Sequence, residues 1–97
     1  MEIYFKENLI LLRRLKNVTQ KQLAEMMGIA QGAISNYEAG TIEPRLTNLI
    51  KLAEIFRIDV DTLLLDDLSK ISLQDILNEN TKRNKRLGEQ AEPDKED

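Results

Sequence analysis

Hydrophobic residues recur at helical spacing near the start of the chain. Phe5, Leu9 and Leu12 follow one another at intervals of four and three residues, so they share one helical face. This spacing predicts a helix over residues 4–16. The helix should end at Asn17, because asparagine tolerates the left-handed conformation that closes many helices.

A second predicted helix begins with a capping box. Thr19 and Gln22 form the pattern T-x-x-Q, in which each side chain accepts a hydrogen bond from the backbone N–H of the other residue. Gly28 ends the helix after about two turns, a length that needs tertiary packing to persist. We expect its hydrophobic residues in the core and not around a ligand: Leu23, Ala24, Met26 and Met27.

A third helix is predicted over residues 31–39, separated from the second by only three residues. Ile34 and Tyr37 lie three positions apart and should point inward, which makes Tyr37 a core residue. Gly40 closes this helix. Residues 41–44 then form a loop, because the proline at its end disfavours helical conformation in the residue before it.

Two further helices complete the predicted domain. Residues 46–56 hold helical spacing at their hydrophobic positions, which are Leu46, Leu49, Ile50, Ala53 and Phe56. A fifth helix follows the N-cap candidate Asp59 and contributes Val60, Leu63 and Leu64. No stretch alternates with a period of two, so we predict no strand and an all-α domain of five short helices over residues 1–67.

The composition changes toward the C-terminus. Residues 68–80 predict one extra helix, which serves either dimerisation or packing against Leu11 and Leu15. Residues 81–97 are almost wholly polar and are predicted to be a mobile charged tail. The basic run at 82–86 within it is equally well explained as a DNA-binding arm and as a solvated segment.

The composition also excludes several classes of function. Cysteine and histidine are absent, which rules out disulfides, thiolate metal sites and imidazole catalysis. We therefore expect neither an enzyme nor a bound metal or cofactor. No hydrophobic run approaches the roughly 18 residues that span a bilayer, and the first residues lack a basic signal region. The expectation is a cytoplasmic protein with no membrane partner.

The net charge of −3, from 14 basic and 17 acidic residues, does not by itself favour a nucleic-acid partner. The local arrangement of the second and third helices does. Joined by a short turn with Gly28, they match the helix-turn-helix motif, whose second helix enters the DNA major groove. The outward residues of that helix are small or polar, with no acid among them: Gln31, Gly32, Ala33, Ser35 and Asn36. Glutamine and asparagine pair with adenine, and a small apolar group such as that of Ala33 contacts a thymine methyl.

Residues 9–64 carry a series of marks in a fixed order: Val18-Thr19-Gln20, Leu23-Ala24, Gly28, Ile34-Ser35, Tyr37-Glu38, Gly40, Pro44 and Leu63-Leu64. In this order and spacing they resemble the Cro/CI-type helix-turn-helix family of phage repressors and bacterial regulators, often called the XRE family. The resemblance implies a lambda-repressor-like fold and a transcriptional regulator that binds double-stranded DNA.

The resemblance also implies roles for single residues. Gln20 stands at the family's phosphate and base contact, which braces the first residue of the recognition helix. Lys21 and Arg45 are placed to hold phosphates. Arg13 and Glu38 stand where relatives form a buried structural ion pair. The base-reading positions fall on Gln31, Gly32 and Asn36, with Ala33 and Ser35 beside them.

Two positions depart from the family pattern within the recognition helix. Ala30 stands where the family has a serine or threonine N-cap, whose loss costs about 1 kcal/mol. Gly32 adds a helix penalty of up to roughly 1 kcal/mol. We therefore expect a recognition helix that is less rigid than the family norm.

These features together predict a repressor that binds a palindromic operator as a homodimer, with half-sites about one helical turn apart. By resemblance, the dimer interface involves the fourth and fifth helices around residues 56–60. Three alternatives stay open: an antitoxin whose tail wraps a toxin, a restriction–modification controller, and a protein–protein adaptor that no longer binds DNA. In the first case the C-terminal segment would bind a partner protein. The adaptor predicts charge reversal on the reading face, which residues 31–36 do not have.

Overall fold

The computed structural model describes residues 1–70. Every secondary-structure element in this range is a helix. These are α1 (Phe5–Lys16), α2 (Gln20–Met27), α3 (Gln31–Ala39), α4 (Leu46–Phe56), α5 (Val60–Leu65) and a final 3-10 turn, η1 (Leu68–Lys70). No strand occurs within this part of the chain. The predicted all-α domain of five short helices is confirmed.

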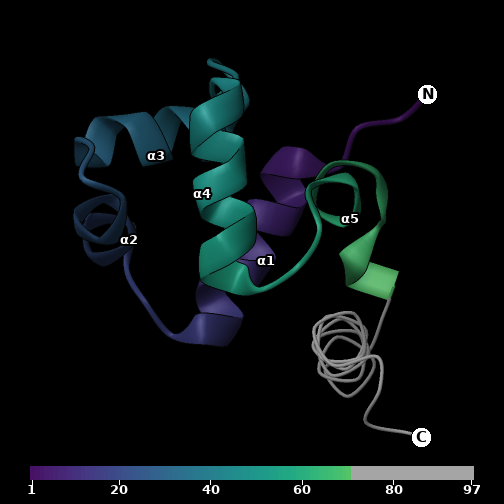
Figure 1. Ribbon diagram of the computed structural model, residues 1–97, viewed down its shortest axis with the longest axis horizontal. Coiled ribbons are helices and arrows are strands. Elements are labelled where there is room, and N and C mark those ends of the chain that lie inside the picture. The colour runs from purple at the N-terminus through teal and green to yellow at the C-terminus, as the bar shows by residue number, and fades with distance from the viewer. Residues whose placement is uncertain (71–97) are drawn as a thin grey trace, which may run out of the picture.

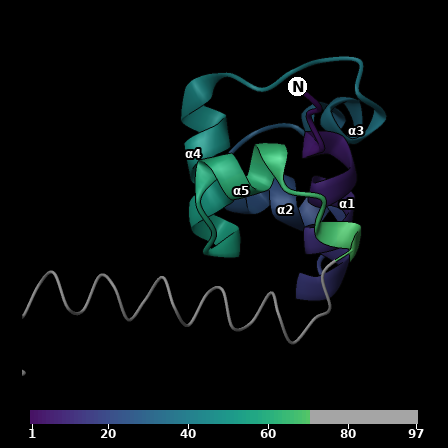
Figure 2. The same cartoon turned by 90° about the vertical axis from the view of Figure 1, so that its right-hand side faces the viewer.

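Helix α4 runs through the middle of the domain, with α2 and α3 on one side of it and α5 on the other (Figure 1). The view turned by 90° shows α4 and α1 on opposite sides of the domain, with α5 between them (Figure 2). One core joins all these elements. Its buried hydrophobic residues are Phe5, Leu9, Leu12, Leu23, Ala24, Met27, Ile34, Tyr37, Leu52, Ala53, Phe56, Ile58, Leu63 and Leu68.

Several helices begin or end at residues whose local preferences favour a helix boundary. The Gln22 N–H donates to Thr19 Oγ1 at 3.0 Å and the Thr19 N–H donates to Gln22 Oε1 at 2.8 Å, so the predicted capping box is present. Gly28 closes α2 with a φ of 73° and Asn17 closes α1 with a φ of 63°. Helix α4 ends at Phe56 as predicted, but Arg57 closes it with a φ of 60°, a conformation for which the sequence gives no signal.

The predicted core face of α4 was partly wrong. Leu46 is 66% exposed and Ile50 is 41% exposed, whereas Leu52 is completely buried. The buried stripe runs through Leu52, Ala53 and Phe56. Because hydrophobic residues occur almost all around α4, its sequence fits two helical stripes equally well, and only contacts with the other helices decide between them.

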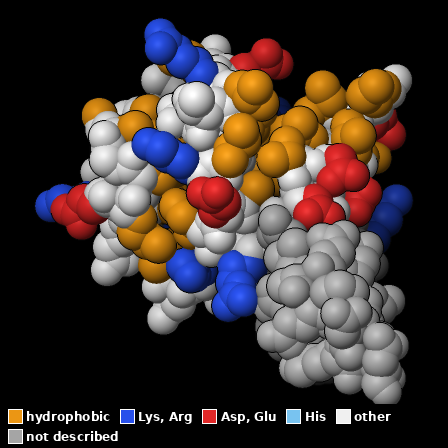
Figure 3. Space-filling view, viewed as in Figure 1, with side chains coloured by type: hydrophobic (Ala, Val, Ile, Leu, Met, Phe, Trp, Pro, Cys, Tyr) orange, Lys and Arg blue, Asp and Glu red, His pale blue; other side chains and the backbone are white. Residues whose placement is uncertain are grey.

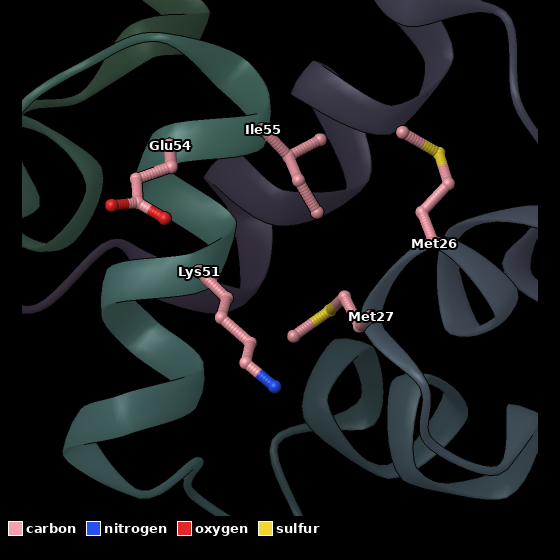
Figure 4. A pocket seen from close by; sticks show the side chains of 5 residues that line it. All are labelled: Met26, Met27, Lys51, Glu54 and Ile55. Atoms are coloured by element: carbon pink, nitrogen blue, oxygen red, sulfur yellow. The ribbon is translucent and has the colours of Figure 1, made fainter.

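Met26 was also predicted to be a core residue, and this is wrong. Its side chain is 49% exposed, while Met27 is buried at 4% exposure. Neighbouring residues on a helix point about 100° apart, and α2 turns Leu23, Ala24 and Met27 to the core. Met26 instead borders an open hollow of about 360 Å³ between α2 and α4, lined also by Met27, Lys51, Glu54 and Ile55 (Figure 4).

A buried asparagine fastens the end of the domain to α1. Asn8 is 1% exposed, and its Nδ2 donates to Leu63 O at 2.9 Å and to Asp66 O at 2.7 Å. Its Oδ1 accepts from the Leu68 N–H at 3.2 Å. Leu68 is buried in the core.

The remaining sequence predictions for the C-terminal part, a helix reaching residue 80 and a tail over 81–97, lie outside the described residues. Among residues 1–70, no helix is both long enough and apolar enough to cross a membrane.

Candidate nucleic-acid interface

The turn between α2 and α3 is short and well bonded. The Gly28 N–H donates to Glu25 O at 3.2 Å and the Ile29 N–H donates to Ala24 O at 3.0 Å, which closes the last turn of α2. Ile29 packs against the core, and α3 begins two residues later at Gln31. The two helices therefore form a helix-turn-helix in which the position of α3 is set by α2.

Helix α3 has one buried face and one polar face. Ile34 is completely buried and Tyr37 is 5% exposed, with its ring edge against Phe5 at a centroid distance of 6.3 Å. The Tyr37 hydroxyl accepts a hydrogen bond from Asn48 Nδ2 at 3.1 Å, so the expectation that Tyr37 is a core residue is confirmed. Of the predicted reading residues, Gln31, Gly32 and Ser35 are exposed, Asn36 is half-buried, and Ala33 is half-buried and packs against the core.

Glu38, the only acidic residue of α3, forms an ion pair with Arg13 of α1. Arg13 Nε donates to Glu38 Oε2 at 2.6 Å, and Arg13 Nη2 donates to Glu38 Oε1 at 3.2 Å. The exposed fractions of the two side chains are only 14% and 8%, respectively. This two-point ion pair joins α1 to the end of α3 and leaves the outer face of α3 without an unpaired acid.

The predicted phosphate-holding residues lie at helix starts. Lys21 is exposed in the first turn of α2, and Arg45 is exposed at the N-cap of α4, where its side chain makes no capping bond. Gln20 differs from the expectation. We expected its side chain to contact Gln31, the first residue of α3. Instead, Gln20 Nε2 donates a hydrogen bond to Glu38 Oε1 at 3.0 Å.

Sequence reasoning missed one residue that shapes the reading face. The Thr41 hydroxyl donates toward Asn36 Oδ1 at 3.2 Å and lies 3.3 Å from the Asn36 carbonyl oxygen. A hydroxyl residue directly after the helix-closing Gly40 is a local signal that could have indicated this contact. Thr41 therefore limits how the Asn36 amide can turn.

The N-terminal end of α3 lacks the usual cap. Ala30 has the extended conformation of an N-cap residue, with φ −73° and ψ 149°, but no side-chain hydrogen bond caps the helix. A Cβ added at Gly32 would meet no atom within 4 Å. Ala30 and Gly32 are therefore both exposed, and a larger side chain at either position would project into solvent.

The acids and the hydrophobic surface lie mainly away from α3. Asp61 and Asp66 are exposed on and directly after α5, and acidic side chains gather there in the space-filling view (Figure 3). Figure 3 also shows hydrophobic side chains gathered over α4 and α5. No group of three acidic, cysteine or histidine residues able to hold a metal ion occurs among residues 1–70.

Comparison with known proteins decides the family. A family model described as helix-turn-helix matches residues 9–63, which include α2, the turn and α3. The chain belongs to the helix-turn-helix family. This is the XRE type that the sequence resemblance indicated.

The similar proteins of known name are HTH-type transcriptional regulators. The chain is 35% identical over 71 residues to the HTH-type transcriptional regulator YqaE of Bacillus subtilis strain 168, covering 73% of this chain and 61% of that one. It is 35% identical over 75 residues to YonR, a prophage-derived HTH-type regulator of the same strain, covering 77% and 69%. The match thus spans 61% of the length of the first relative and 69% of the second.

Among solved structures, the chain is similar to the P22 c2 repressor in complex with a synthetic operator. The TM-score is 0.62 at 30% identity, and the match covers 65% of this chain and 96% of that one. The lambda-repressor-like fold predicted from the sequence is therefore confirmed.

Proposed function

We propose that this helix-turn-helix regulator is a repressor that binds a palindromic operator as a homodimer in the cytoplasm, with α3 of each copy in a major groove. One observation carries the proposal: the outer face of α3 is polar, and its only acid, Glu38, is paired to Arg13 at 2.6 Å. A face of this kind can approach the negatively charged groove. The structurally similar P22 c2 repressor was solved with an operator, which supports the same arrangement here.

The base contacts are assigned to the exposed side of α3. The residues are Gln31, Gly32, Ala33, Ser35 and Asn36. Gln31 stands in the first turn of α3 with an exposed amide, which suits bidentate pairing with adenine. Asn36 Oδ1 already accepts a hydrogen bond from Thr41, which leaves the two Nδ2 donors for acceptor atoms on the bases.

The phosphate contacts are assigned to the starts of α2 and α4. Lys21 and Arg45 are exposed and positively charged there, and Gln20 is the first residue of α2, directly before Lys21. Contacts of this kind set the register of the protein on the duplex and carry no sequence information themselves. They also make the affinity fall with rising salt.

The homodimer is supported by two arguments. A single short reading helix makes too few contacts for the affinities of about 10⁻⁸ M or tighter that specific DNA-binding proteins reach. The face over α4 and α5 also exposes hydrophobic side chains, with Leu46 at 66%, Ile50 at 41% and Leu65 at 42%. Pairing two copies through this face would bury them and relate the two α3 helices by a two-fold axis.

The test is a selection of bound sequences from random duplex DNA at about 50 mM and about 200 mM salt. We expect an enriched inverted repeat that is bound much more weakly at the higher salt. No enrichment at the lower salt would contradict sequence-specific DNA binding by this chain. A single unrepeated motif would contradict the homodimer.

A matched pair of variants tests the dimer face separately. Ile50→Glu places a charge on it, whereas Met26→Glu makes the same kind of change at another exposed hydrophobic residue, on α2. In sedimentation, we expect Ile50→Glu to be monomeric and Met26→Glu to remain dimeric. Two dimeric variants would rule out this face as the interface.

A further inference from the structure

Glu38 is a hydrogen-bond centre that joins three helices. Its carboxylate accepts from Arg13 Nε at 2.6 Å and Nη2 at 3.2 Å, both from α1, and from Gln20 Nε2 at 3.0 Å, from the start of α2. Arg13 Nη1 also donates to Val18 O at 3.0 Å, directly before α2. The ion pair therefore fixes where α2 begins relative to α3.

The charge on Glu38 also decides which way the Gln20 amide faces. An ionised carboxylate only accepts hydrogen bonds, so Gln20 must turn its NH₂ group toward it and its oxygen away. The Arg13 guanidinium holds the carboxylate in its charged form by a two-point contact. The second N–H of Gln20 remains available, and Gln20 is only half-buried at the start of α2.

We propose that Glu38 is a positioning residue for DNA binding, which holds the Gln20 amide so that its second N–H can donate to a phosphate oxygen. The proposal rests on the proposed function. Glu38 itself, with its side chain 8% exposed, does not contact the DNA. A phosphate oxygen is an acceptor, as is the carboxylate, so one NH₂ group can bridge the two only in the orientation that Glu38 imposes.

The test is a double-mutant cycle on the affinity for the duplex recovered by the selection above. Gln20→Ala should weaken binding about fivefold to tenfold in the wild-type background, the effect of one lost hydrogen bond. In a Glu38→Gln background, where the side chain at position 38 is neutral and can also donate, Gln20→Ala should change the affinity less than about twofold. An equal factor in both backgrounds would overturn the proposal.

The control is Glu25→Gln, which removes one negative charge from an exposed position of α2. Gln20→Ala should retain its full effect in that background. Circular dichroism gives the folded fraction of each variant, and affinities refer to folded protein. If Glu38→Gln does not fold, Glu38→Asp replaces it, because the shorter side chain keeps the charge for Arg13 but withdraws from Gln20.

A measurement on the free protein separates this proposal from the proposed function. In NMR spectra, the Gln20 side-chain NH₂ protons should exchange slowly with solvent in the wild type and quickly in Glu38→Gln. Fast exchange in the wild type would overturn the positioning role even if DNA binds. Slow exchange in a protein that selects no duplex would contradict the proposed function and leave Glu38 with a structural role alone.

Discussion

The uncapped start of α3 gives the most quantitative prediction. Ala30 already has the extended conformation of an N-cap residue and is exposed, so a serine there needs no change of the backbone. Its hydroxyl would accept from the Gly32 or Ala33 N–H at the start of the helix. Ala30→Ser should therefore stabilise the domain by about 1 kcal/mol.

Gly32 offers a second, independent gain in the same helix. A Cβ at this position would meet nothing within 4 Å, and Gly32 has no positive φ that would strain another residue. Gly32→Ala should add about 1 kcal/mol through its lower conformational entropy in the unfolded chain. The two changes together should add about 2 kcal/mol, which corresponds to a rise in Tm of about 8–16 °C for a domain of this size.

The assay is urea and thermal denaturation followed by circular dichroism. Thr19→Ala is the matched control, because Thr19 Oγ1 caps α2 at 3.0 Å and the loss of this cap should cost about 1 kcal/mol. A clear loss in Thr19→Ala with no gain in Ala30→Ser or Gly32→Ala would refute the reasoning, since it would mean that α3 frays for another reason or is already fully stabilised by packing.

Three further predictions concern stability and are checked by the same denaturation experiments. Asn8→Ala should cost about 3 kcal/mol or more, because one buried carbonyl, one part-buried carbonyl and one buried N–H lose their partner; a cost below about 1 kcal/mol would mean that water replaces the side chain. Arg57→Gly should stabilise by about 1 kcal/mol by relieving the left-handed conformation at φ 60°, while Asn17→Gly at φ 63° should gain less; equal gains would contradict this explanation. Arg13→Met should cost about 3–5 kcal/mol by leaving the Glu38 charge buried alone. The double variant Arg13→Met with Glu38→Leu should recover most of that loss, and no recovery would show that the ion pair itself stabilises the domain.

Helix positions could be predicted from the sequence where the signal is local. Thr19 with Gln22, Gly28 and Gly40 mark their helix ends through their own backbone and side-chain preferences, and the structure has each of them in that role. Arg57 gave no such signal. The buried Ile58, whose N–H donates to Ala53 O at 3.0 Å, requires the chain to reverse there, so packing overrides the preference of arginine.

Non-local contacts could not be predicted in the same way. The exposure of Ile50 in place of Leu52 depends on how α4 is rotated against its neighbours. Asn8 is a polar residue in an otherwise hydrophobic stripe, and its partners lie 55 or more positions away in sequence. The Gln20–Glu38 hydrogen bond likewise joins residues 18 positions apart, which meet only because α2 and α3 pack together.

The candidate reading face followed from residue type and spacing alone, since Ile34 and Tyr37 fix which side of α3 is buried. The orientation of the amides on that face did not follow. Thr41, which lies just after the end of α3, orients the Asn36 amide. Glu38 orients the Gln20 amide through a tertiary contact between α3 and α2.

The most direct test of the account is the base specificity of Gln31→Ala. Affinities of wild type and Gln31→Ala would be measured for the selected duplex and for every single base-pair change in one half-site. If Gln31 reads a base, Gln31→Ala should lose discrimination of about 1–3 kcal/mol at one base pair per half-site and keep it elsewhere. A uniform loss across all sequences, or unchanged discrimination at every position, would contradict base reading by α3.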